Sequence, residues 1–186
     1  MRMRTKWFKN HNKGPEQNAS ALAFIFWQIA IDRLRHLRTN QFQVFTPQLT
    51  VDVLAEMACF LVHLADREFH EKLELNDRNQ LLQLMAKNIS VTYADNALDA
   101  LGPSDHASQF IDLLNQRLPS YSEVSGTGEG LRYALSRLLG SYIEKLVLEK
   151  DKQWIAQQVI EIEIPEILSK FDKAIADLTS LTTPEK

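Results

Sequence analysis

Cysteine, glycine and proline are scarce in this sequence of 186 residues, which has one cysteine, six glycines and six prolines. The single cysteine, Cys59, cannot form an intramolecular disulfide, so nothing argues for an oxidising compartment. The sequence also has no apolar run that approaches the length of a membrane span, and its first residues lack the apolar core of a signal peptide. We therefore expect a cytoplasmic protein.

Charge is unevenly distributed along the chain, whose net charge is -3. Residues 1–13 contain five basic residues and no acidic one, which leaves 16 basic and 24 acidic residues, a net charge of -8, for the rest. Nucleic-acid binding needs a basic face, so this acidic body argues against nucleic acid as a partner. With 45% hydrophobic and 24% charged residues, the composition is that of a globular protein.

Apolar residues recur at three- and four-residue steps through most of the chain, the spacing of amphipathic helices. Helices are expected over residues 18–38, 47–70, 76–101, 104–118, 129–146 and 151–164. Thr46 and Pro47 form a helix start, and Gly102 followed by Pro103 forms a stop. The sequence thus predicts an all-α, single-domain, bundle-like array of about five to seven helices.

The predicted organisation is a basic flexible tail at 1–17, a globular domain at 18–180 and a frayed end at 181–186. Pro119 is expected to end a helix, and the loop-like residues 119–130 to form a mobile connection. A kink or break is expected at Pro165. FQVF at 42–45 and VIEIEI at 159–164 alternate with period two, so they could pair as a minor two-stranded ribbon.

The segment HLADREFH, residues 63–70, places His63, Asp66 and His70 on one stripe of a predicted helix. Glu56 and Cys59 fall on the same stripe. At about 100° per residue, this stripe lies beside the apolar band of the helix. We therefore expect its side chains to form a solvated flank beside the core, with Asp66 and Arg67 making local ion pairs.

Metal binding is the chemical alternative for this stripe. The two histidines are about 10.5 Å apart along a straight helix, too far to share one ion. Asp66 with His63, or Asp66 with His70, could chelate a metal if later helices supply carboxylates such as Glu144 or Glu161. No Glu-x-x-His motif, the usual supplier of ligands in di-iron bundles, occurs in the sequence.

Other catalytic patterns are incomplete. Cys59 has His63 four residues on, which allows a thiolate pair, but a cysteine in the sequence ACFLV is typical of an inert core. The glycine-rich SGTGEG at 125–130 matches neither a P-loop nor a dinucleotide fingerprint. A flexible helix entry is the better interpretation of these glycines.

The N-terminal tail combines cations with aromatic rings. Its contact residues for an anionic membrane surface or an acidic partner would be Arg2, Arg4, Lys6, Trp7, Phe8 and Lys9. The stretch is short, so peripheral membrane association through it would be weak.

Every catalytic arrangement considered lacks a necessary part. We therefore expect a non-catalytic protein that acts through protein–protein interaction or ligand binding, with self-association as the commonest form of helix-surface pairing. No cofactor is predicted, and a metal ion is the alternative. A small-molecule pocket between helices has no residue signature in the sequence.

Overall fold

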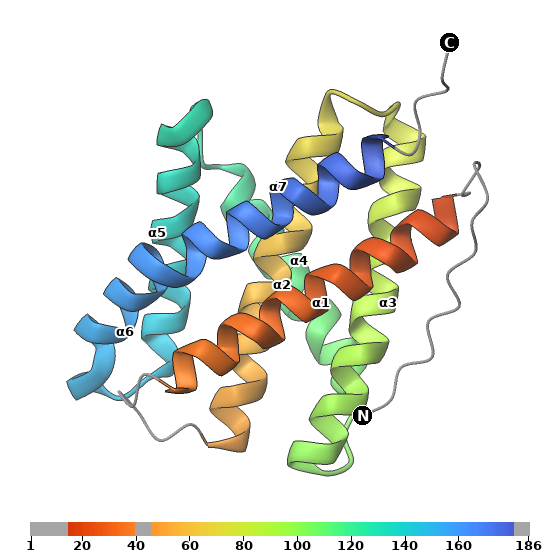
Figure 1. Cartoon of the computed structure of the whole chain (residues 1–186). Coiled ribbons are helices and arrows are strands. Elements are labelled where there is room, and N and C mark those ends of the chain that lie inside the picture. The colour runs from red at the N-terminus through yellow and green to blue at the C-terminus, as the bar shows by residue number, and fades with distance from the viewer. Residues whose placement is uncertain (1–14, 40–45, 181–186) are drawn as a thin grey trace.

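The part of the chain that the structure describes, residues 15–39 and 46–180, is helical almost throughout (Figure 1). This computed structural model has no strand in those ranges. Its α-helices are α1 (Pro15–Thr39), α2 (Pro47–His70), α3 (Leu75–Leu101), α4 (His106–Ser122), α5 (Gly128–Leu146), α6 (Lys152–Gln158) and α7 (Ile164–Ser180). A 3-10 turn, η1 (Glu149–Asp151), precedes α6, and a π-helix, η2 (Val159–Glu163), joins α6 to α7. The predicted all-α, bundle-like fold is confirmed.

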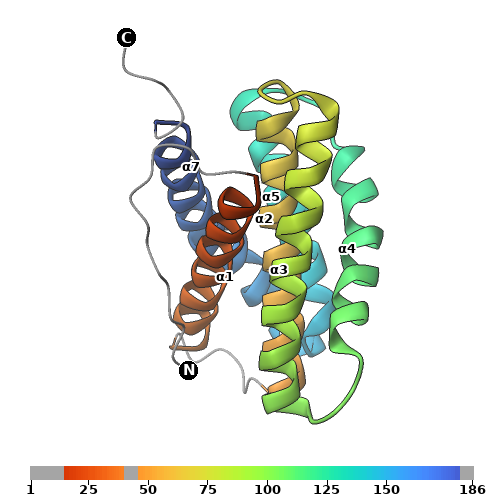
Figure 2. The same ribbon diagram turned by 90° about the vertical axis from the view of Figure 1, so that its right-hand side faces the viewer.

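The helices form three layers around α2. α2 and α3 lie side by side in the middle, α1 covers one face of them with α7 beside it, and α4 covers the opposite face (Figure 2). α1 and α7 run next to each other and cross the middle layer obliquely (Figure 1). Because α2 contacts α1, α3, α4 and α5, it is the central helix of the fold.

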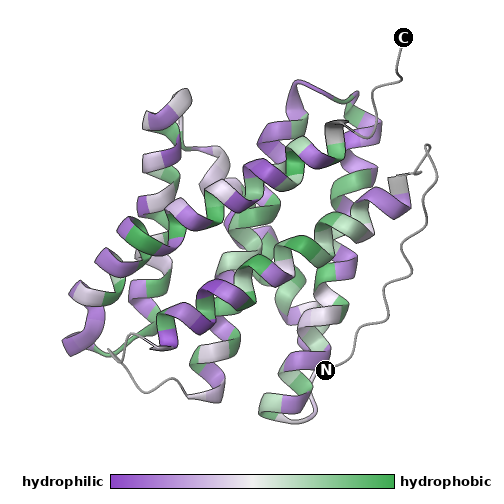
Figure 3. Cartoon of the chain, in the orientation of Figure 1, coloured by the Kyte–Doolittle hydropathy of each residue, from purple (hydrophilic) through white to green (hydrophobic). Residues whose placement is uncertain are grey.

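Neighbouring helices surround α2 on nearly every side, and 16 of its 24 residues are buried. The expectation that no segment approaches a membrane span is wrong for this helix. Its most apolar window of 18 residues has a mean hydropathy of 1.4, and 83% of that window is buried inside the fold. A helix that is apolar all round suits the centre of a bundle. Hydrophobic residues gather toward the centre of the molecule, where α1 crosses the helices behind it (Figure 3).

Two helix ends follow the sequence signals, and one does not. The Thr46 hydroxyl accepts a hydrogen bond from the Leu49 amide (3.1 Å), which caps α2. Gly102 ends α3 with a φ of +87°, a conformation that glycine adopts without strain. The predicted end at Pro119 is wrong, because α4 continues through this proline to Ser122. Burial of the Tyr121 side chain against α2 and α5 offsets the one backbone hydrogen bond that proline removes.

The predicted strand at 159–164 is also wrong. These residues form η2 and the first residue of α7, with the Ile164 amide bonded to the Val159 carbonyl five residues earlier. Val159, Glu163 and Ile164 are buried, so the fold buries this segment by a helical turn and not by strand pairing. The wide turn comes directly before Pro165, where a regular α-helix would meet a steric clash. The other half of the expected ribbon, residues 42–45, lies outside the described residues.

Candidate functional site

The stripe of metal-capable side chains on α2 is divided between the core and the surface. Glu56, Cys59 and His63 are 2%, 0% and 1% exposed, whereas Asp66 is half-buried and His70 is exposed. The expectation that this stripe flanks the core is therefore wrong for the first three. Helices α4 and α5 pack over this side of α2 and bury it.

An arginine engages His63. The Arg67 Nε donates to the His63 Nε2 (2.8 Å), while the Arg67 Nη2 donates to the carbonyls of Tyr121 (3.1 Å) and Val124 (2.6 Å). Because Nε2 accepts a hydrogen bond, the proton of the neutral imidazole lies on Nδ1. The guanidinium thus occupies the position from which Nε2 would bind a metal.

A second arginine, Arg78 on α3, engages the other two members of the stripe. Its Nε lies 3.1 Å from the Asp66 carboxylate, and its Nη1 contacts the His70 Nδ1. The facing helix therefore brings a cation to the stripe where a metal site would need carboxylates. Among residues 15–39 and 46–180, no three His, Cys, Asp or Glu side chains gather closely enough to hold a metal ion.

Burial also shapes the protonation of this part of α2. It lowers the pKa of His63 to about 4, with a further contribution from the Arg67 charge. The imidazole stacks on the Tyr121 ring, with centroids 5.1 Å apart. Burial, and then the charge of Glu56, raise the pKa of the Cys59 thiol well above its ordinary value. Cys59 and His63 are therefore a neutral thiol and a neutral imidazole, not a thiolate pair.

Beside these residues, the buried Glu56 on α2 forms an ion pair with the half-buried Arg117 on α4. Arg117 donates from Nε (2.9 Å) and Nη2 (2.6 Å) to the two oxygens of Glu56. Its guanidinium lies 3.9 Å from the centroid of the Tyr142 ring. Hydrogen bonding to Glu56 raises the pKa of Arg117, which holds the guanidinium in its charged form.

The Glu56–Arg117 pair closes one end of a pocket between α2, α3 and α4, which we call the α2–α4 pocket. Its volume is about 490 Å³, within the range of small-molecule sites. One wall comes from α2 and the other from a stripe of α4. The lining residues are Gln48, Asp52, Ala55, Glu56, Tyr93, Leu101, Ser104, His106, Gln109, Leu113, Arg117 and Leu146.

The polar groups of the α2–α4 pocket carry a net negative charge. Asp52 is half-buried and accepts a hydrogen bond from the Gln48 Nε2 (2.8 Å). Burial raises the pKa of Asp52, and it raises the pKa of Tyr93 to about 12 with a contribution from the Asp52 charge. His106 is held in place by a hydrogen bond between its Nε2 and the Gly102 carbonyl (2.8 Å).

Sequence reasoning did not predict the α2–α4 pocket. One signal was present, because Asp52 and Glu56 are the only acidic residues between Pro47 and Leu64 of α2. Two carboxylates one helical turn apart in such an apolar helix need partners or a solvated pocket. Arg117 could not be assigned to Glu56, since the two residues are 61 positions apart in the chain.

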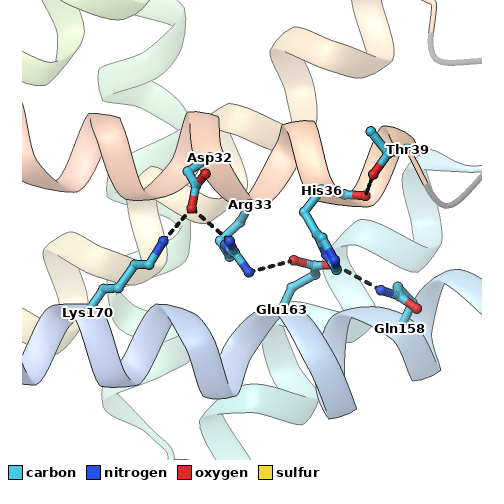
Figure 4. A network of polar contacts seen from close by, with 7 residues as sticks. All are labelled: Asp32, Arg33, His36, Thr39, Gln158, Glu163 and Lys170. Atoms are coloured by element: carbon cyan, nitrogen blue, oxygen red, sulfur yellow. Dashed lines mark hydrogen bonds and ion pairs between the residues drawn. The ribbon is translucent and has the colours of Figure 1, made fainter.

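A second polar cluster, centred on the buried Glu163, joins α1 to α6, η2 and α7 (Figure 4). Glu163, which is fully buried, lies 2.8 Å from the His36 Nδ1 and accepts from the Gln158 Nε2 (2.9 Å). Asp32 pairs with Lys170 and with Arg33, and these two contacts lower its pKa to about 2. The cluster balances acids with bases across one helix interface, which fits a role in holding α7 against α1.

Comparison of the chain with known protein families, curated proteins and solved structures gives no match, so the α2–α4 pocket is interpreted from its own geometry.

Proposed function

We propose that this protein is a non-catalytic helical protein that binds a small molecule in the α2–α4 pocket. The observation that carries the proposal is a cavity of about 490 Å³ whose walls combine the Glu56–Arg117 ion pair, the half-buried Asp52 and apolar side chains. Ligand sites usually have this composition, an apolar wall with a few fixed polar groups. The polar groups are held by hydrogen bonds before any ligand arrives, so little ordering is needed on binding.

A pocket-filling variant tests the proposal. Leu113 lines the α2–α4 pocket and is half-buried, so Leu113→Trp should occupy the cavity. Leu118 is also half-buried on α4 but lines a different pocket of about 390 Å³, which makes Leu118→Trp a matched control. Ligand-observed NMR with a fragment set of mixed charge should give hits that bind the unmodified protein and Leu118→Trp but not Leu113→Trp.

Two results would contradict the proposal. One is a fragment set with no hit at all, and the other is a set of hits that Leu113→Trp binds as well as the unmodified chain does. Far-UV circular dichroism of both tryptophan variants establishes that each is folded before binding is compared.

The remaining sequence-based expectations stay predictions. Self-association can be checked by sedimentation, with attention to Val91 and Leu98, apolar side chains on α3 that are 53% and 48% exposed. Membrane contact through the tail concerns residues 1–14, which lie outside the described part of the chain. Cytoplasmic location is likewise a prediction.

A further inference from the structure

We propose that the α2–α4 pocket selects a small organic cation, a primary amine or guanidine with a compact apolar body, and that Asp52 is the group that recognises its charge. This inference rests on the proposed function and names the class of ligand. It is carried by the different states of the two carboxylates that line the pocket.

The first step concerns which carboxylate is free to bind. Both oxygens of Glu56 accept hydrogen bonds from Arg117, so this acid is already paired. Asp52 lies one helical turn away and accepts one hydrogen bond, at Oδ1, from Gln48. Its Oδ2 receives no hydrogen bond from residues 15–39 or 46–180. Asp52 is therefore the acceptor that the pocket offers to a ligand.

The second step concerns the charge of the pocket as a whole. The charges of Glu56 and Arg117 cancel, which leaves the Asp52 carboxylate unbalanced. Both ring nitrogens of His106 are engaged away from Asp52, since Nε2 lies 2.8 Å from the Gly102 carbonyl and Nδ1 lies 3.2 Å from the Gln109 Oε1. Lys145 lies near the Tyr142 ring, 5.5 Å from its centroid, and is not among the lining residues. A ligand with one positive charge would complete the neutralisation.

The third step excludes the other charge classes. An anion would meet the charge of Asp52, and the charge of Arg117 is already balanced by Glu56 through Nε and Nη2. A neutral ligand would displace the water that solvates Asp52 and would bring no positive charge in its place. Loss of that solvation is unfavourable for a half-buried carboxylate. A charge-assisted hydrogen bond from an ammonium or guanidinium group avoids both losses.

The apolar lining defines the rest of the ligand. Ala55, Leu101, Leu113 and the ring of Tyr93 line the same pocket as Asp52. An aromatic ring also attracts a cation through its π face, so Tyr93 favours the same charge that Asp52 selects. Together they predict a cationic head and a short apolar body.

Benzylamine, benzyl alcohol and benzoate test the charge preference, because they share one apolar body and differ in charge. Protein-observed NMR titrations should show that benzylamine shifts signals of the pocket residues and binds about tenfold or more tightly than benzyl alcohol, the ratio that one charge-assisted hydrogen bond supplies. Asp52→Asn should bring the ratio of the two affinities close to one, since asparagine keeps the shape of the side chain but not its charge. Asp95→Asn, which removes the same charge from an exposed position on α3, should leave the ratio unchanged.

Acidification gives an independent readout. Because burial raises the pKa of Asp52, benzylamine affinity should fall at a mildly acidic pH at which ordinary aspartates are still ionised. Tighter binding of benzoate or benzyl alcohol in the pocket would overturn the cation preference and leave the proposed function standing. Benzylamine affinity that is the same in Asp52→Asn would also overturn it. If none of the three probes and no member of the fragment set binds, both proposals fail.

Discussion

His63 should make the protein sensitive to mild acid. The side chain is 1% exposed, and burial lowers its pKa from 6.5 to about 4. Between these two values the unfolded chain binds a proton at this imidazole and the folded chain does not. Stability therefore falls as the pH falls through this window, because the unfolded state binds more protons.

The magnitude follows from the width of the window. Each unit of pKa difference corresponds to about 1.4 kcal/mol, so a shift from 6.5 to about 4 removes on the order of 3 kcal/mol of stability by pH 4. Most small domains are stable by about 5–15 kcal/mol, so this loss would be a large fraction of the total.

Urea denaturation at pH 7, 5.5 and 4, followed by circular dichroism, measures the effect. In His63→Gln the amide oxygen can still accept from Arg67, but the side chain does not titrate. This variant should lose about 3 kcal/mol less than the unmodified protein between pH 7 and 4. His70→Gln is the matched control, because His70 is exposed, and it should keep the unmodified pH dependence. If His63→Gln and the unmodified chain lose the same stability, the burial of a neutral imidazole is not the cause.

Two further perturbations test the buried contacts. Arg117→Met should cost about 3–5 kcal/mol, because it leaves the buried Glu56 carboxylate without its partner. Glu56→Gln should cost less, because the Arg117 side chain that it leaves unpaired is 22% exposed. The double variant Glu56→Leu/Arg117→Met should recover most of the larger loss. The midpoints of urea denaturation measure these losses, and a cost of Arg117→Met below about 1 kcal/mol would show that Glu56 is not desolvated. Gly140→Ala should cost about 1–3 kcal/mol, because its new Cβ would lie 2.7 Å from the Ile160 Cγ1. In an Ile160→Ala background the same substitution should be nearly neutral, and an equal cost in both backgrounds would refute the proposed clash.

The local signals in the sequence predicted helix starts and stops well. Thr46 with Pro47 and Gly102 with Pro103 act through atoms within a few residues of each other, so their effect does not depend on the rest of the fold. Pro119 misled the prediction because the burial of Tyr121, a tertiary contact, decides where α4 ends.

The candidate site was less predictable than the fold. The angular pattern of α2 identified one apolar band, but neighbours on several sides of this helix bury the polar stripe as well. Glu56 and His63 were therefore expected at the surface and lie in the core. The partner of Glu56 could not be assigned from spacing, because Arg117 comes from a helix far along the chain. Arg67 is one helical turn from His63, but its position also depends on the carbonyls of Tyr121 and Val124, which the sequence does not place.

The central position of α2 has a consequence for synthesis on the ribosome. This helix ends at His70, while α5, which also covers it, ends at Leu146, 76 residues later. At about 5–20 residues per second, roughly 4–15 seconds pass between the synthesis of the two ends. During that interval α2, the most apolar of the described helices, is not yet covered by α5. We expect the nascent chain to depend on chaperone protection most strongly in this period, and substitutions that slow the docking of α5 to lower the yield of folded protein.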